Sequence, residues 1–179
     1  MTKENPTDDA LRVKIKSDAL RLISFKPRSI DELRRRLKLK KYPDAKVEET
    51  IESFKKQGLL DDEKFARLFA HSRVYSRPSG KRQLEFDLKR KGLSDSLVAE
   101  TLKSLGDYDE KKAARDLTYA RFQKMTGVSK EKKKARLFGF LKRRGFSDGA
   151  IFGALAELFS AEGGSAASCG GKECENLES

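Results

Sequence analysis

Basic side chains gather at two places in the sequence where a helix is expected to end. The two stretches are KRKGLSD at 89–95 and KRRGFSD at 142–148. Lysine and arginine donate charge-assisted hydrogen bonds to phosphate and carboxylate groups, so such clusters are suited to binding anions. The same residues also suit a plain helix end, because cations are stabilised at the negative end of the helix dipole. A charge run is often only a solvated helix surface, and one copy alone does not separate these interpretations.

The remaining letters of each stretch predict a tight turn between two helices. Gly92 and Gly145 follow the basic residues, and glycine is the residue that enters the left-handed region without a Cβ clash. Ser-Asp comes two residues later, and both types are favoured N-caps of a following helix. We call each helix–turn–helix stretch a corner. A third corner is found at 38–44.

The corners belong to a longer repeat. Leucines precede each corner at the same spacing, and apolar residues follow it in register, with an offset of 51 residues between the first two copies and 53 between the last two. Six apolar positions and one aspartate hold this register across three copies, which predicts three structural repeats. The repeated core positions are Leu33, Leu37, Tyr42, Val47, Ile51, Phe54, with Leu84, Leu88, Leu93, Val98, Leu102, Leu105 as their counterparts in the second copy.

Helical periodicity and breaks at proline or glycine predict an all-α protein of three tandem three-helix repeats in an elongated arrangement. We expect a flexible N-terminus at 1–9, repeats at 10–60, 61–108 and 109–160, and a disordered tail at 161–179. The acids Asp61, Asp62 and Glu63 are interpreted as a helix start, because acids favour the positive end of the helix dipole.

Composition points to an acidic partner. The 179-residue chain has 40 Lys and Arg against 28 Asp and Glu, a net charge of +12 and a pI near 9.7. Nucleic acid or a nucleoprotein is the first expectation for such a charge. No apolar run is long enough for a bilayer and no signal-peptide core is seen, so we expect a cytoplasmic protein without membrane contact.

No catalytic or metal-binding pattern is found. Phosphate-binding, dinucleotide-binding, zinc-protease and serine-hydrolase motifs are all missing from the sequence. His71 is the one histidine, and Cys169 and Cys174 both lie in the Gly/Ser-rich tail, too few ligands for a structural zinc site. We therefore predict a protein that is not an enzyme and that has no cofactor and no metal.

The register of the repeat makes the basic residues informative. If the repeats stack in series, equivalent cations form a basic ridge, and we predict that this ridge contacts the partner. A helix-turn-helix DNA reader is disfavoured, because the helices after the first and third corners carry acids or no basic residue. The predicted binding residues are Lys38, Lys40, Lys41, Arg82, Lys89, Arg90, Lys91, Lys142, Arg143 and Arg144.

The sequence resembles the RecX family of bacterial recombinase regulators. The matching segments are KPRSIDELRRRL at 26–37, GLLDDEKFA at 58–66, GKRQLEFDLKRKGL at 80–93 and FLKRRGF at 140–146, in an order and spacing that cover residues 18–159. One departure is Lys41-Tyr42-Pro43, where the other corners have glycine and an apolar residue. A first corner of different shape is therefore expected.

The resemblance implies a regulator of the recombinase RecA that binds the RecA–DNA filament along its groove. Such a protein is expected to inhibit ATP hydrolysis, strand exchange and co-protease activity, and so to damp DNA recombination, DNA repair and the SOS response. It is expected to act as a monomer. The alternative is a sequence-independent DNA-binding or architectural protein that affects the recombinase only indirectly.

Overall fold

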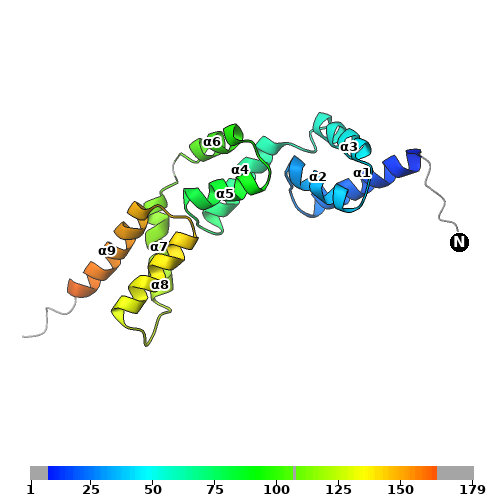
Figure 1. Ribbon diagram of the computed structural model, residues 1–179. Helices are drawn as coiled ribbons and strands as arrows, with labels where there is room; N and C mark the ends of the chain where they lie inside the picture. Colours follow the sequence, from blue (N-terminus) through cyan, green and yellow to red (C-terminus); the bar gives the residue numbers. More distant parts are fainter. Residues whose placement is uncertain (1–7, 107, 165–179) are drawn as a thin grey trace, which may run out of the picture. The chain divides into compact units, whose positions relative to one another are not determined.

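The computed structural model describes residues 8–106 and 108–164, and the described part is entirely helical, with no strand. Nine helices follow one another in it (Figure 1): α1 (Asp8–Phe25), α2 (Ile30–Leu39), α3 (Asp44–Lys56), α4 (Asp62–Tyr75), α5 (Lys81–Arg90), α6 (Asp95–Ser104), α7 (Glu110–Phe122), α8 (Lys130–Arg143) and α9 (Asp148–Gly164). They form the three predicted three-helix repeats, so the predicted fold class is confirmed. Of the predicted tail at 161–179, residues 161–164 belong to α9, and the part from 165 onward lies outside the described residues.

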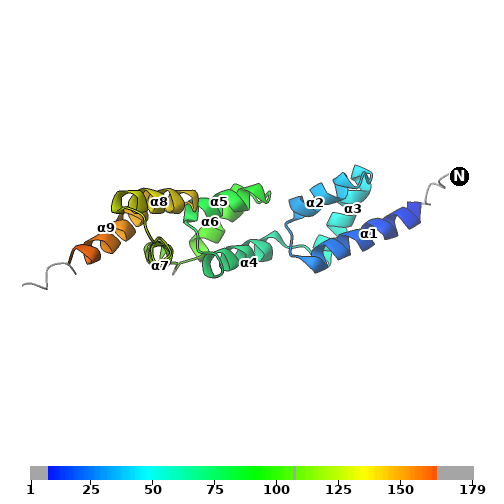
Figure 2. The ribbon, with the colours of Figure 1, turned by 90° about the horizontal axis from the view of Figure 1, so that it is seen from below.

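Each repeat has its own apolar core. The first core is built around Ile15, Leu33 and Ile51, the second around Ala66 and Leu88, and each of these side chains is buried. In the third core Leu137 and Leu141 are buried against Phe146 of the corner and Ile151 of α9. The leucines before each corner therefore hold the equivalent core positions that the register predicts. Figure 2 shows the helices of each repeat lying together.

Local capping explains where many of the helices begin. Ser29, Asp61, Ser94 and Asp109 stand at N-cap positions, and the side chain of each accepts a hydrogen bond from the backbone N–H three residues later. Such bonds satisfy backbone donors that have no partner inside the helix. The interpretation of Asp61, Asp62 and Glu63 as a helix start is thereby confirmed, with Asp61 as the N-cap and the other two in the first turn.

The described chain divides into two compact units. One contains residues up to Arg77 together with Leu84–Tyr108, and the other contains Pro78–Gln83 together with the chain from Asp109 onward. Helix α1 begins at Asp8 and α9 continues to Gly164, four residues past the predicted end of the third repeat. The elongated arrangement of the repeats remains a prediction.

Candidate functional site: the corners and their basic side chains

All three corners have a left-handed residue at the same position. Gly92 and Gly145 have φ values of 80° and 73°, and Lys41, at the equivalent position, has a φ of 59°. Lysine therefore adopts the left-handed conformation that glycine adopts in the other copies. The first corner differs from the second at its cap, as expected from its departing sequence: Pro43 makes no side-chain cap hydrogen bond, whereas Ser94 accepts one from the N–H of Leu97.

An ion pair crosses each corner at the same place. The first basic residue of each corner lies 3.0 Å or less from the aspartate that begins the next helix, and the three pairs are Lys38–Asp44, Lys89–Asp95 and Lys142–Asp148. The hydrogen bond to Asp95, and then that to Glu85, raises the pKa of Lys89. Much of the charge of these lysines is thus already matched inside the repeat.

The second corner docks onto the start of α2 in the preceding repeat. Ser29 Oγ donates to the carbonyl of Lys91 at 2.5 Å, and a Cβ on Gly92 would lie 2.3 Å from the Asp31 carboxylate. Lys91 Nζ lies 2.9 Å from Glu32 Oε2. Burial by itself would raise the pKa of Glu32, but the hydrogen bond from Lys91 and its charge outweigh this effect and lower it.

The third corner repeats this docking on the segment before α5. The N–H of Gly80 donates to the carbonyl of Arg144 at 2.8 Å, and Arg144 Nη1 donates to the carbonyl of Pro78 at 3.0 Å. A Cβ on Gly145 would lie 2.5 Å from the Cβ of Gln83. We call these two contacts the first and the second joint. Each lies within one of the two compact units.

An acid at the start of the next repeat completes each joint. Asp62 Oδ1 accepts from the N–H of Ile30 at 2.9 Å, and Glu110 Oε1 accepts from the N–H of Lys81 at 3.3 Å. Ile30 and Lys81 are equivalent in the repeat. Burial raises the pKa of Asp62, and the Ile30 hydrogen bond opposes that effect. The glycine corner is therefore repeated because it connects one repeat to the next.

The remaining predicted binding residues differ in their exposure. Lys40 lies 2.5 Å from Asp18, whereas the side chain of Arg90 is 67% exposed and its nearest carboxylate, on Asp87, is 3.8 Å away. Lys41 and Arg82 are exposed, and Arg143 borders a groove on α8. The structure therefore separates the predicted residues into side chains held in ion pairs or joints and a smaller set that is accessible.

Comparison with known proteins identifies the family. The family models described as "RecX, first three-helix domain" and "RecX, second three-helix domain" match residues 16–54 and 61–102. A regulatory protein RecX from Chlorobium phaeobacteroides is 33% identical over 141 residues, which cover 79% of this chain and 91% of that protein. The chain belongs to the RecX family. A second relative, from Streptomyces coelicolor, is 30% identical over 144 residues, covering 80% of this chain and 77% of that protein.

Solved structures show the same fold. The crystal structure of RecX from Lactobacillus salivarius superposes with a TM-score of 0.68 at 19% identity, covering 84% of this chain and 97% of that one. Another crystal structure of a regulatory protein RecX gives a TM-score of 0.67, covering 84% of this chain and 78% of that one. As a member of this family, the chain is a regulatory protein and not an enzyme. No helix among the described residues has the length and apolar character needed to cross a bilayer.

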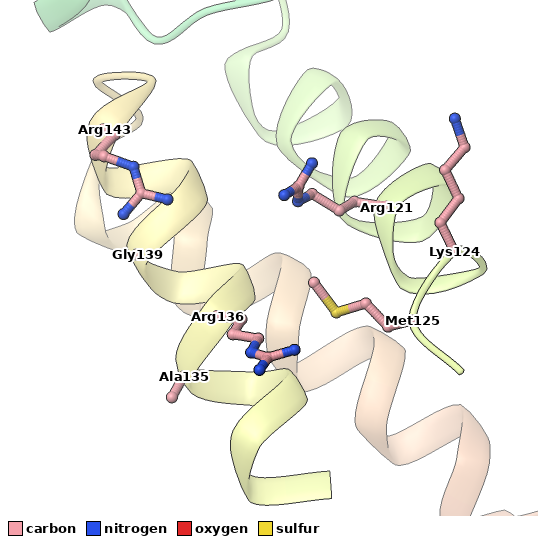
Figure 3. A pocket seen from close by; sticks show the side chains of 7 residues that line it. All are labelled: Arg121, Lys124, Met125, Ala135, Arg136, Gly139 and Arg143. Carbon is pink, nitrogen blue, oxygen red and sulfur yellow. The ribbon is translucent and has the colours of Figure 1, made fainter. Parts of the chain in front are cut away.

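The ridge prediction missed a basic groove in the third repeat of this RecX-family chain. A groove of about 510 Å³ lies between α7 and α8, and its lining includes Arg121 of α7, Lys124 just after α7, and Arg136 and Arg143 of α8. Figure 3 shows Arg121 pointing across it toward α8. Three of these four cations lie outside the predicted set. The register of the repeat could have drawn attention to Arg136, because it stands where the first repeat has Glu32.

Proposed function

We propose that this chain regulates the recombinase RecA by binding the RecA–DNA filament. The observation that carries the proposal is that the chain belongs to the RecX family. It is 33% identical to a regulatory protein RecX, and the match covers 91% of that protein. Under the same proposal, the chain lowers the ATP hydrolysis, strand exchange and co-protease activity of RecA, and so weakens the SOS response.

The charge distribution supports a nucleoprotein partner. The net charge is +12, and the exposed cations of Lys41, Arg90 and the α7–α8 groove remain after the ion pairs of the corners are taken into account. A filament presents the negative charge of DNA together with a protein surface, and both are available to a basic protein of several repeats. Binding without sequence preference is expected, because the proposal rests on phosphate contacts and not on base contacts.

The alternative is a DNA-binding protein that reaches the recombinase only by covering DNA. The same basic side chains support it, because a cation does not distinguish bare DNA from DNA inside a filament. The two functions differ in their preference for the filament. Competition between filament and bare DNA therefore separates them.

Cosedimentation with preformed RecA filaments tests the proposal. We expect the chain to stay with the filaments in the presence of excess bare duplex. Raising salt should weaken duplex binding with a slope of about −4 to −5 in log K against log salt if about five phosphates are contacted, and filament binding should fall less steeply. Transfer of the chain to the bare duplex at every salt concentration would contradict filament regulation and favour the alternative.

A further inference from the structure

The third repeat has a face equivalent to the one that the first joint uses on α2, but among the described residues no corner covers it. In the first joint the face of α2 is formed by Asp31, Glu32 and Arg35, which contact the corner of the next repeat. Register places Ala135, Arg136 and Gly139 at the equivalent positions of α8. Within residues 108–164 no further corner follows, and these three residues line the open groove beside α7 instead.

The charge of this face is reversed relative to the first joint. Glu32 receives the basic Lys91 in the first joint, whereas Arg136 would repel a basic side chain at the same place. The corner of a second copy carries Lys38, Lys40 and Lys41 and is therefore a poor occupant. A face that has lost both acids and has its one arginine at the position of Glu32 favours an anionic partner over another repeat.

The groove carries four cations without a carboxylate on its lining. Among the described residues, none of Arg121, Lys124, Arg136 and Arg143 forms an ion pair, and no acid borders the groove. The corresponding groove at the first joint differs, because Glu32 and Lys91 both line it. Figure 3 shows Arg121 and Arg136 projecting into the space between α7 and α8 from opposite sides.

The geometry of the groove suits an extended anion. Arg136 and Arg143 are seven residues apart on α8, which is about 10 Å along the helix, or roughly three nucleotides of a strand that rises about 3.4 Å each. Ala135 and Gly139 on the same lining have no long side chain, so a chain of sugars and phosphates can approach the helix closely. Arg121 is held with its guanidinium 4.6 Å from the ring centre of Phe140, which limits its motion before a ligand binds.

We propose that the α7–α8 groove binds the sugar-phosphate backbone of one nucleic-acid strand. Three arginines can each offer a planar pair of donors to phosphate oxygens, and the donors lie on both sides of the strand. The groove adds a specific DNA contact to the proposed function. The test of the groove uses bare DNA without recombinase. A negative result in that test would leave the proposal of filament regulation standing, and a negative result in the filament assay would leave the proposal of the groove standing.

The test compares two double variants of α8 with the same change in net charge. Arg136→Glu with Arg143→Glu reverses the groove, whereas Lys132→Glu with Lys134→Glu reverses two exposed lysines outside its lining. Affinity for a fluorescent single-stranded oligonucleotide, and for a duplex of the same length, is measured over a series of salt concentrations. Circular dichroism shows whether the glutamate variants fold. If they do not, the double variant Arg136→Gln with Arg143→Gln is measured in their place.

The groove variants are expected to weaken single-strand binding about tenfold and to reduce the salt slope by about 1.4, the value for two lost phosphate contacts. The lysine control should change the affinity much less. Equal losses in the groove and control pairs would overturn the proposal, since net charge alone would then explain binding. It would also be overturned if the groove variants kept full DNA affinity while losing affinity for poly-glutamate, a result that assigns the groove to an acidic protein segment.

Discussion

At the scale of single residues, the same kind of side chain has different roles according to its place in the corner. Lys89 pairs with Asp95 across the turn, Lys91 pairs with Glu32 in the first joint, and Arg90 between them is the most exposed of the three. Replacing all three by glutamate would therefore break a joint as well as remove accessible charge. Arg90 alone is the informative position for partner binding in this corner.

Tyr42 gives a titration that reports on the first repeat. Burial, followed by its hydrogen bond to Asp18 at 2.7 Å, raises the pKa of Tyr42 to about 12. Because the folded pKa lies above the usual value of about 10, the contribution to stability is complete below pH 10 and is lost as the pH rises from about 10 to 12. Ultraviolet absorbance of phenolate should show a step near pH 12 that Tyr42→Phe removes. If Tyr42→Phe instead removes a step near pH 10, Tyr42 is not buried and hydrogen-bonded to Asp18 as described.

At the scale of helices and turns, the glycines of the corners differ from other turn glycines by what lies against them. Gly92 and Gly145 have a positive φ and also touch the preceding repeat or segment, whereas Gly58 has a φ of 69° with nothing within 4 Å of an added Cβ. Lys41 shows that the left-handed turn alone tolerates a side chain. Close packing in the joint, more than the turn, therefore makes glycine necessary at the later corners.

Alanine substitutions separate the two effects. Gly58→Ala should lower the free energy of unfolding by about 1–2 kcal/mol, the cost of a left-handed non-glycine residue. Gly92→Ala should cost about 1–3 kcal/mol more, because the Cβ forces apart the contact with Asp31. Urea unfolding followed by circular dichroism measures both variants. If both variants lose the same free energy of unfolding, the contact between Gly92 and Asp31 does not require glycine, and this explanation is contradicted.

Much at this scale was predictable from the sequence. The 3.6-residue period and the capping residues predict the helices, and the three-fold register predicts that Leu37, Leu88 and Leu141 are buried, as found. The joints were not predictable, because Asp62 meets Ile30 only after two helices fold back, and no local pattern records that meeting. The pairing of Lys40 with Asp18 was unpredictable for the same reason, since it bridges 22 residues, and the ridge itself stays a prediction.

At the scale of the whole molecule, the chain is a series of repeats that share one fold and differ in the charged residues on their surfaces. The first joint uses the face of α2 that carries Asp31 and Glu32, and the third repeat presents the equivalent face with its charge reversed. We therefore infer that binding takes place on surfaces that the joints leave open, and that several such surfaces act together on the filament.

Inhibition of DNA-dependent ATP hydrolysis by RecA tests that central claim most directly. The chain is titrated into RecA filaments on single-stranded DNA at two DNA concentrations. A filament regulator should inhibit at a ratio well below one chain per RecA, and the amount needed should not rise with added bare DNA. If half-inhibition instead requires the chain in proportion to total DNA, the protein acts by covering DNA and the account of filament regulation is contradicted.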